Sequence, residues 1–360
     1  MPKTVYFDAR YIRVDHHDGI SRFSVGLIEA LMPMVEVVAI ISDHRQLDKL
    51  PSGIKHVFLN DPTSWLEVFA AMRLNKYRPQ IVYSPMQTIG SMGRKFSLVL
   101  TLHDLIYYRH PKPPPSLPLA VRLGWRLYHL TYWPQRLVLN RADSVVTVSQ
   151  TTKELMLNHR LTKKRIDVVY NAAGDLDSEY EHKPPAMRPR SNQNLVYMGS
   201  FMDYKNVETL IKGMSDLPGY RLNLLSSISQ DRLEQLQSLV SPTGGEVVFH
   251  NGVSEAKYHE VLSSAVALVT ASRDEGFGIP LVEAMVRGIP VVVSDIQIFK
   301  EIGGQAATYF ETDSSTSFSD AVRSLENPVV WSEKSKLALV QSAQFNWTKS
   351  ATSLVNALFQ

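Results

Sequence analysis

Short apolar runs rich in Val, Ile and Leu alternate with stretches of helical periodicity along the whole chain. Most of these runs are continuous and do not place a polar residue at every second position, which is typical of parallel strands covered by helices on both faces. Such alternation predicts an α/β fold built on parallel sheets. The expected strands are 4–8, 36–41, 80–84, 98–102, 144–148, 166–170, 195–198, 221–225, 246–250, 267–270, 291–294 and 307–310. The expected helices lie near 20–33, 64–77, 119–139, 150–160, 205–215, 229–240, 255–265, 280–288, 315–326, 333–344 and 348–358.

The length and one break in the pattern predict two domains. The chain has 360 residues, which is more than one ordinary hydrophobic core holds. Between 175 and 194 the periodicity stops, and the stretch contains three prolines and many charges, as linkers do. We therefore expect Rossmann-like domains over 1–175 and 195–345, a linker over 176–194, and a C-terminal helix over 346–360. Open α/β sheets bind ligands at the carboxyl ends of their strands, so we expect the active site in a cleft between the domains.

Composition excludes several kinds of chemistry. The absence of cysteine excludes a disulfide framework, a zinc–thiolate site, an iron–sulfur cluster and a cysteine nucleophile. The net charge of +3 is too small to indicate nucleic acid, and we expect no nucleic-acid partner. The charge is unevenly distributed, because residues 1–180 carry 23 Lys and Arg against 16 Asp and Glu, whereas 181–360 carry 15 against 19. A basic half and an acidic half indicate two domains with different partners.

Neither a signal peptide nor a membrane-spanning helix is expected. The start, Met-Pro-Lys followed by the strand-like run 4–7, lacks a long apolar region after basic residues. No window of 18 consecutive residues is apolar throughout. We therefore expect a cytoplasmic protein.

The segment 272–285 carries the clearest functional signal, because it places two glutamates around a glycine-rich turn. The glycines allow a backbone to approach a ligand closely, and Pro280 suits the first position of a helix, whose free N–H groups can bind an anion such as a diphosphate. Glu283 lies about one turn into that helix, while Glu275 precedes the turn. Two carboxylates so placed suit the paired hydroxyls of sugars. A capped helix on a tight turn, with solvated glutamates, is the alternative interpretation.

Other polar residues have functional interpretations of their own. Lys205 comes at the start of an expected helix, where its charge is unfavourable for the helix dipole, and this favours an anionic ligand over a solvated lysine. Arg273 is a second candidate cation, with a surface ion pair to Asp274 as the alternative. His103 follows an expected strand at the edge where ligands bind, with a surface histidine as the alternative. Asp104 beside it is either an acceptor-side base or a cap.

Residues 275–285, with the pattern Glu-Gly-Phe-Gly-x-Pro-x-x-Glu-Ala-Met, resemble the signature of the retaining nucleotide-sugar glycosyltransferases of family GT4. Other segments similar to this family are 19–23, 101–105, 147–149, 168–171, 197–200 with 205–206, 288–294, 301–304 and 345–347. The resemblance therefore extends over nearly the whole chain. The implied fold is GT-B, in which two Rossmann-like domains with parallel sheets face an inter-domain cleft, the first binding the acceptor and the second the donor. In this fold the last helix often packs back on the N-terminal domain.

The resemblance implies transfer of a sugar from a nucleoside diphosphate sugar, with retention at the anomeric carbon and without a cofactor or metal. The donor would be GDP-mannose or a related hexose, and the acceptor a glycan or lipid-linked molecule of surface polysaccharide or glycolipid synthesis. The implied catalytic residues are His103, Asp104 and Glu275. The implied donor-binding residues are Gly19, Gly199, Ser200, Lys205, Val253, Arg273, Gly276, Phe277, Gly278, Ile279 and Glu283.

Five of these residues have a stated role in the implied reaction. Glu275 would hold hydroxyls of the transferred sugar, and Glu283 those of the ribose. Lys205 and Arg273, with the helix start near Pro280, would stabilise the leaving diphosphate. His103 would meet the transferred sugar or the attacking acceptor. No covalent intermediate is expected, because no enzymic nucleophile is evident.

The resemblance also implies that the backbone at Val253 would run along the nucleobase and that the backbone at Gly19 would approach the diphosphate.

The sequence departs from the family at several positions. Ser200 and Tyr204 stand where many members carry Arg, and 226–227 is Ser-Ser where a pair of glycines is common. These changes leave the implied fold intact but bear on the identity of the donor.

Two segments of the N-terminal half suggest further partners. We interpret the Asp-His-His-Asp run at 15–18 as a loop and not as a metal site, and no Asp-x-Asp motif stands in a suitable place. Residues 109–141 combine six Lys and Arg and no acidic residue with Trp and Tyr among leucines. Basic and aromatic residues on an apolar helix suit an anionic membrane interface, so we expect peripheral contact at the inner face of the membrane and a lipid-linked or other anionic acceptor. A core-facing helix with a solvated basic side is the alternative.

Two other functions remain open at this point. One is a GT-B sugar-nucleotide epimerase, which would act on the donor without an acceptor. The other is an inactive homologue that serves as a binding subunit of a glycan-assembly complex. A nicotinamide dehydrogenase is set aside, because no Gly-x-Gly-x-x-Gly follows the first expected strand.

Overall fold

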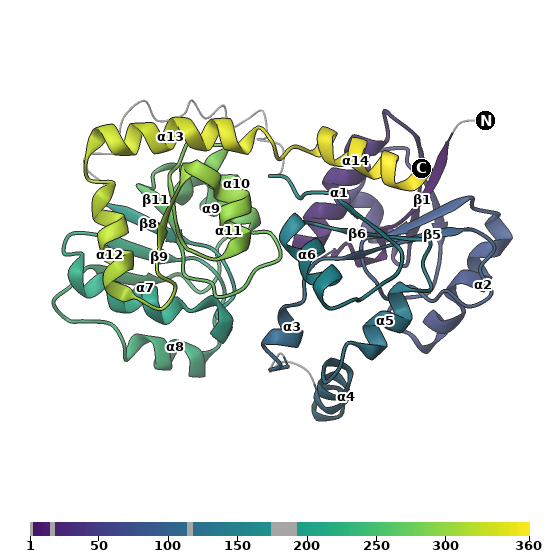
Figure 1. Cartoon of the computed structure of the whole chain (residues 1–360), viewed down its shortest axis with the longest axis horizontal. Helices are drawn as coiled ribbons and strands as arrows, with labels where there is room; N and C mark the ends of the chain where they lie inside the picture. Colours follow the sequence, from purple (N-terminus) through teal and green to yellow (C-terminus); the bar gives the residue numbers. More distant parts are fainter. Residues whose placement is uncertain (1–2, 15–18, 114–117, 174–192) are drawn as a thin grey trace. The chain divides into compact units, whose positions relative to one another are not determined.

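The computed structural model describes residues 3–14, 19–113, 118–173 and 193–360. The chain divides into two compact units, one formed by Met1–Gly174 with Asn346–Gln360 and the other by Asp175–Phe345 (Figure 1). Nearly all of the expected linker over 176–194 lies outside the described residues, and so does the run 15–18 that we interpret as a loop.

The first unit is built on a seven-stranded parallel sheet with the strand order β3-β2-β1-β4-β5-β6-β7. Its strands are β1 (Thr4–Asp8), β2 (Glu36–Ile41), β3 (Lys55–Phe58), β4 (Ile81–Ser84), β5 (Ser97–Leu102), β6 (Ser144–Thr147) and β7 (Arg165–Val168). The sequence pattern did not predict β3. This strand lies at the edge of the sheet and most of its residues are exposed, so it has no apolar run.

The helices of the first unit are α1 (Gly19–Leu31), α2 (Ala70–Leu74), α3 (Ile106–Arg109), α4 (Leu119–His129), α5 (Trp133–Leu139), α6 (Gln150–Asn158) and α14 (Trp347–Phe359). The prediction of one helix near 119–139 is wrong, because α4 and α5 are separate. Pro134 lies in the first turn of α5, where a proline without an N–H begins a helix well but cannot continue the preceding one.

The second unit has a six-stranded parallel sheet with the order β10-β9-β8-β11-β12-β13. Its strands are β8 (Asn194–Tyr197), β9 (Arg221–Leu224), β10 (Glu246–Phe249), β11 (Ala267–Thr270), β12 (Val291–Ser294) and β13 (Ala307–Phe310). Its helices are α7 (Val207–Gly213), α8 (Gln230–Gln237), α9 (Glu255–Ser263), α10 (Ile279–Met285), α11 (Gln297–Gly303), α12 (Ser315–Ser324) and α13 (Pro328–Ser342). The two parallel sheets confirm the predicted α/β class.

Each sheet has one point at which the order of its strands reverses. The reversal falls between β1 and β4 in the first unit and between β8 and β11 in the second. Connections from two such neighbouring strands leave toward opposite faces of the sheet, which opens a crevice at their carboxyl ends where open α/β sheets bind ligands. Most of the predicted donor-binding residues follow β8 or β11 in the sequence, so the topology brings them to one such crevice.

The last helix, α14, belongs to the first unit and packs on α1. The indole of Trp347 occupies the space beside Gly26, where a Cβ would lie 2.3 Å from the ring. Arg165 of β7 donates a hydrogen bond to the carbonyl of Ala357, and Ser350 Oγ donates to the carbonyl of Tyr170 at 2.7 Å. These contacts attach the C-terminal residues to α1 and to the end of β7.

Replacing Gly26 by alanine tests this attachment. Gly26→Ala is expected to destabilise the first unit by about 1–3 kcal/mol, because the new methyl group overlaps the Trp347 ring. Gly124→Ala is the matched control, since Gly124 also lies inside a helix but a Cβ there would meet nothing within 4 Å. In that variant, helix propensity alone should raise the stability by about 0.5–1 kcal/mol. Thermal and urea unfolding measure both changes, and a Gly26→Ala protein as stable as the wild type would contradict the packing of α14 on α1.

Candidate functional site

Two loops meet at the reversal point of the second sheet. The first follows β8 and leads through Gly199 to Lys205, and the second follows β11 and contains Glu275. Because β8 and β11 pair in parallel, with Leu195 opposite Ala267, the two loops leave the same edge of the sheet side by side. The topology therefore joins residues about 70 positions apart in the sequence.

An ion pair connects these two loops. Lys205 Nζ lies 2.5 Å from Glu275 Oε1, and both side chains are only 14% exposed. Ser272 Oγ donates a second hydrogen bond to the same oxygen at 2.9 Å, and Ser272 in turn lies 3.1 Å from Thr270 Oγ1. Within the described part of the chain, Glu275 Oε2 makes no hydrogen bond. One carboxylate oxygen is thus fixed by the protein, while the other can accept from a ligand hydroxyl.

Arg273 ties three loops together. Its backbone N–H donates to the carbonyl of Tyr204 at 2.7 Å, and its side chain donates to the carbonyl of Asp203 and to Asn206 Oδ1, both at 2.8 Å. The guanidinium also pairs with Asp313, which follows β13. The ion pair with Asp274 that was the alternative in the sequence is thus replaced by one with Asp313. Arg273 fixes the loop that carries Lys205, and its direct contact with a diphosphate remains a prediction.

Gly199 is required by a close contact with a buried tyrosine. A Cβ at Gly199 would lie 2.9 Å from the hydroxyl of Tyr197, which itself donates to the carbonyl of Ser200 at 2.6 Å. Burial and the nearby Glu275 carboxylate raise the pKa of Tyr197 well above its usual value, so its hydroxyl remains a neutral hydrogen-bond donor. The N–H of Gly199 donates to Ser226 Oγ at 3.1 Å, so one of the serines that replace the family's glycines supports this turn.

The segment between the two glutamates forms a tight turn. Gly276 and Phe277 are buried, and Gly278 adopts φ = +94°, a left-handed conformation that favours glycine. Helix α10 then begins at Ile279 and has only seven residues. Its dipole is correspondingly short, and binding of an anion by this helix start or by Lys205 remains a prediction.

Glu283 lies in a buried polar group beneath this turn. It is 4% exposed, and Tyr258 of α9 donates a hydrogen bond to its Oε2 at 2.7 Å. Arg287 donates to the Glu283 carbonyl at 2.8 Å and lies 3.0 Å from His259 Nδ1. The sequence pattern predicts a role for neither Tyr258 nor Arg287. No local pattern marks Tyr258, which lies 25 positions from Glu283 and on another helix.

Val253 lies in the turn between β10 and α9, and it is half-buried. The turn is held by Asn251 and Gly252, which both adopt positive φ, and the N–H of Gly252 donates to the carbonyl of Leu225 at 3.1 Å. A Cβ at Gly252 would lie 2.6 Å from Ser227 Oγ. The backbone at Val253 therefore follows the ends of β9 and β10, and its contact with a nucleobase remains a prediction.

The remaining predicted residues belong to the first unit. His103 follows β5, and its Nε2 lies 2.8 Å from the carbonyl of Pro85, while its ring packs edge to face on Phe23 at 5.2 Å. Asp104 accepts from the N–H of Ile106 at 3.0 Å, as a cap does. Gly19 is the first residue of α1 and is exposed. Contact of these three residues with substrate remains a prediction.

A buried ionic group that the sequence analysis missed lies at the reversal point of the first sheet. Arg10 forms two-pronged hydrogen bonds with Asp8 and with Glu67 at 2.7–3.0 Å, and it also donates to the carbonyl of Asn60 at 2.9 Å. Ser84 Oγ donates to Asp8 Oδ2 at 3.1 Å. All five N–H donors of the Arg10 guanidinium are thus used, so this group orders the backbone after β1.

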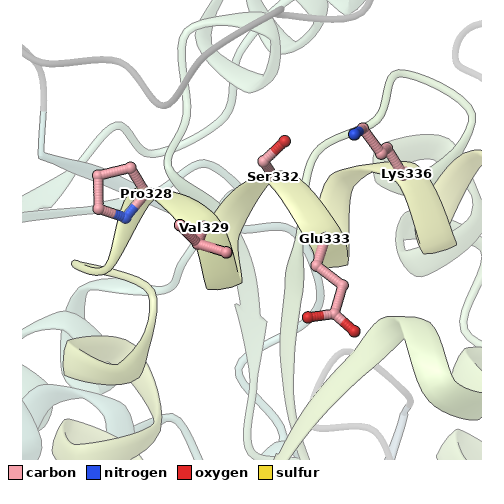
Figure 2. Close-up of a pocket in the computed structure, with 5 residues that line it drawn as sticks. All are labelled: Pro328, Val329, Ser332, Glu333 and Lys336. Carbon is pink, nitrogen blue, oxygen red and sulfur yellow. The ribbon is translucent and has the colours of Figure 1, made fainter.

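Two other features bear on ligands. Among the described residues, no three His, Asp or Glu side chains gather as a metal site would require, and 15–18 lies outside these residues. In the same part of the chain, no helix is both long and apolar enough to cross a membrane. Figure 2 shows a hollow beside α13, lined by Pro328, Val329, Ser332, Glu333 and Lys336, and none of the predicted site residues borders it.

Two family models match the chain, and together they cover most of it. The model described as Glycosyltransferase Family 4 matches residues 17–173, and the model described as Glycosyl transferases group 1 matches residues 178–337.

Curated relatives of similar length exist as well. The O-antigen chain mannosyltransferase RfbU of Salmonella typhimurium is 29% identical over 81% of this chain and 76% of its own length. The O-antigen chain mannosyltransferase B of Escherichia coli is 23% identical over 94% of this chain and 95% of its own.

Solved structures resemble the whole chain. Anabaena HepE, in complex with UDP and glucose, has a TM-score of 0.71 and 16% identity, with 99% of each chain covered. Sucrose-phosphate synthase from Thermosynechococcus elongatus has a TM-score of 0.69 and 18% identity, covering 99% of this chain and 98% of its own. At this identity the likeness shows the fold. With the two parallel sheets and the matching family models, it shows that the chain belongs to the GT4-type glycosyltransferases and has the GT-B fold.

Proposed function

We propose that this glycosyltransferase moves a mannosyl or related hexosyl group, with retention and without a metal, from a nucleoside diphosphate sugar to a glycan or lipid-linked acceptor of surface polysaccharide or glycolipid synthesis. Its O-antigen mannosyltransferase relatives, matched over most of their length, support the sugar and the pathway class. The observation that carries the proposal is the pair of Lys205 and Glu275 at the reversal point of the second sheet.

In this proposal the second unit binds the donor. Lys205 carries the positive charge for the diphosphate, and its ammonium has two N–H donors beyond the one directed at Glu275. Glu275 accepts from hydroxyls of the sugar through Oε2, and Glu283 accepts from the ribose. Negative charge that develops on the departing diphosphate is stabilised by Lys205, which is already in position before the reaction.

The first unit supplies the acceptor side. A carbonyl can only accept, so the contact with Pro85 requires that His103 Nε2 carries a hydrogen, and Nδ1 is then the accepting nitrogen of the neutral ring. Through this imidazole His103 meets the transferred sugar or the attacking hydroxyl. Asp104 acts beside it, either as a base or by capping the turn that holds His103.

Substitution of Glu275 tests the proposal most directly. Glu275→Ala and Glu275→Gln are expected to lower the rate of transfer by about 10²–10³-fold, because a preorganised interaction with the reacting sugar is lost. The assay follows labelled mannose from GDP-mannose into a lipid-linked glycan fraction, with and without EDTA. Glu333→Gln is the control, since Glu333 borders the hollow on α13. Near wild-type transfer by a folded Glu275→Ala protein would refute the assignment.

A nucleotide screen identifies the donor independently of the acceptor. Ligands that bind the folded state raise the melting temperature, so GDP, UDP, ADP and dTDP sugars can be compared by thermal shift. Epimerisation of the donor in the absence of acceptor would favour the epimerase over the transferase. Binding without turnover under any condition would favour the inactive homologue.

The buried Tyr258 provides a second test, directed at ribose binding. Tyr258→Phe removes the hydroxyl that orients Glu283, and Glu283→Gln removes its charge. Both variants are expected to raise the donor KM by about tenfold and to change kcat less, since a hydrogen bond to a charged group is worth about 1.5–3 kcal/mol. The double variant should add little to Glu283→Gln alone, because the two side chains act as a pair. Unchanged donor KM values in both single variants would remove Glu283 from the donor site.

We further propose that the first unit docks on an anionic membrane through α4. The leucines Leu119, Leu123, Leu127 and Leu130 recur at helical spacing and are between 60% and 81% exposed. The other side of the helix packs inward, with Trp125 5.0 Å from the Tyr107 ring. The apolar stripe of this helix therefore faces away from its own unit, which supports membrane contact over a core-facing helix.

The charge around this stripe supports an anionic lipid surface as the partner. Between Asp104 and Asp143 the chain has six Lys and Arg and no acidic residue. Arg126 is exposed and Arg122 half-buried, both within the leucine-bearing helix. A leucine stripe flanked by arginines matches the apolar interior and the negative headgroups of such a membrane at once.

Flotation with vesicles tests this docking. The protein is expected to float with phosphatidylglycerol-containing vesicles at low salt and not with pure phosphatidylcholine. Leu123→Gln with Leu127→Gln should reduce binding by about tenfold or more, since each buried leucine contributes about 1.5–3 kcal/mol. Val329→Gln with Val340→Gln is the matched control, because these two apolar residues are at least as exposed as the two leucines but lie on α13. Equal flotation of the leucine variant and the control would contradict the role of α4.

A further inference from the structure

Three neighbouring strands of the first sheet bring polar residues to their carboxyl ends, and the proposed function uses only one of these residues. Asp8 is the last residue of β1, Ser84 is the last residue of β4, and His103 directly follows β5. The strands lie in the order β1-β4-β5, and the register of the first pair sets Phe7 opposite Tyr83. Parallel pairing therefore brings Asp8, Ser84 and His103 to the same edge of one sheet, within a single unit.

The carboxylate of Asp8 is buried and held in one orientation. It is 0% exposed, and its two oxygens accept hydrogen bonds from Arg10 at 2.7 and 3.0 Å. Glu67 fixes the same guanidinium from its other side, at 2.7 and 2.9 Å. A charged carboxylate can only accept, so the distance of 3.1 Å between Ser84 Oγ and Asp8 Oδ2 means that the serine hydroxyl donates. The buried ion pair thus sets the direction of this hydrogen bond.

The same serine oxygen orients the peptide group that follows it. Because its hydrogen is directed at Asp8, Ser84 Oγ accepts from the N–H of Met86 at 3.3 Å. This N–H belongs to the peptide group between Pro85 and Met86, and in a trans peptide the C=O points away from the N–H. On that other side, the Pro85 carbonyl lies 2.8 Å from Nε2 of His103. One planar group therefore joins the serine to the histidine.

Two further contacts within the first unit restrain this arrangement. The loop that contains Pro85 is fastened at a second point, where the hydroxyls of Tyr11 and Thr88 form a hydrogen bond. The ring of His103 packs edge to face on the buried Phe23, with centroids 5.2 Å apart and an angle of 83° between the planes. Rotation of the imidazole would break both this aromatic contact and the hydrogen bond at Nε2.

We propose that Asp8 and Ser84 are positioning residues for His103. The carboxylate, the serine hydroxyl and the peptide group between Pro85 and Met86 form one hydrogen-bonded chain, which fixes the orientation of the imidazole and its Nε2–H tautomer. Each donor and acceptor in the chain follows from the one before it, beginning with the charge of Asp8. No proton moves along the chain. The inference rests on the proposed function, in which His103 meets a substrate hydroxyl, and it assigns Nδ1 of this tautomer as the accepting nitrogen.

The sharpest test removes the link between the carboxylate and the peptide group. Ser84→Ala is expected to lower kcat by about tenfold to a hundredfold, because misplacement by about 1 Å can cost a hundredfold in rate. The donor KM and the thermal shift produced by GDP-mannose should stay close to those of the wild type, since donor binding is proposed for the second unit. Ser84→Thr keeps a hydroxyl at this position and should retain more activity than Ser84→Ala.

A matched control separates loss of the chain from loss of a buried hydroxyl in general. Ser319 is also 0% exposed, and its Oγ donates to the carbonyls of Gly213 and Ser315 at 2.9 and 2.8 Å, in the second unit. Ser319→Ala should therefore lower the melting temperature about as much as Ser84→Ala and leave kcat unchanged.

A second comparison separates positioning from a structural role. In a His103→Ala background, Ser84→Ala should have little further effect on kcat, because the chain then has no imidazole to place. Asp8→Asn keeps the size of the side chain and removes its charge, so it should lower kcat in the presence of His103 with the donor KM unchanged. Asp8→Asn also weakens the buried ion pair with Arg10, so Ser84→Ala is the decisive variant.

Nitrogen-15 NMR of protein with labelled histidine measures the tautomer directly. A ring nitrogen that carries a hydrogen and one that does not have well-separated shifts, and the His103 signals are those that are missing in His103→Gln. At a pH where the ring is neutral, the wild type should carry the hydrogen on Nε2 alone, whereas Ser84→Ala should populate both tautomers.

The possible failures are distinguishable. Wild-type transfer by both Glu275→Ala and His103→Ala would overturn the proposed function and the positioning with it. Loss of transfer in these two variants, together with wild-type kcat in Ser84→Ala and Asp8→Asn, would overturn the positioning alone. An equal fall in kcat from Ser84→Ala with and without His103 would also overturn it, as would a wild-type His103 with its hydrogen on Nδ1.

Discussion

The parallel pairing of β8 with β11 is the constraint on which the candidate donor site depends. Residues about 70 positions apart can share one hydrogen-bonded group only because these two strands are neighbours at the point where the strand order reverses. The Lys205–Glu275 pair is largely removed from water, which is costly for isolated charges. Ser272 donates a hydrogen bond to the same carboxylate, and Arg273 fixes the backbone that carries the lysine. These hydrogen bonds offset part of the free-energy cost of removing the two charges from water.

Much of this architecture could be predicted from the sequence, because continuous apolar strands and helical periodicity are local signals. The pattern failed where the local signal is absent or ambiguous, as in the exposed edge strand β3 and at the division of α4 from α5 by Pro134. The sequence offers candidate residues for a donor site one by one, yet their partners could not be predicted. Ser272, Tyr258 and Asp313 reach Glu275, Glu283 and Arg273 only through the tertiary fold, and periodicity contains no information about such pairs.

The departures from the family pattern have a structural counterpart. Where a pair of glycines is common, Ser226 accepts from the N–H of Gly199 and Ser227 lies against Gly252. Both turns, which follow β8 and β10, are thus supported by serine side chains that a pair of glycines would lack. Ser200 is exposed and brings no charge, so Lys205 stands as the nearest cation to Glu275 among the described residues. A site with fewer cations places more weight on the precise position of that single ammonium group.

The noncontiguous first unit has a consequence for the way the chain folds. The second unit is one continuous stretch, Asp175–Phe345, whereas the first unit also includes 346–360, which follow the second unit in the sequence. Because Trp347 fills the space beside Gly26, α1 keeps an uncovered apolar surface until residues 346–360 have been synthesised. The usual vectorial order, in which the N-terminal domain completes its fold first, is therefore inverted here. A chain that stops before residue 346 exposes that surface, so α14 completes the first unit only after the whole second unit has been made.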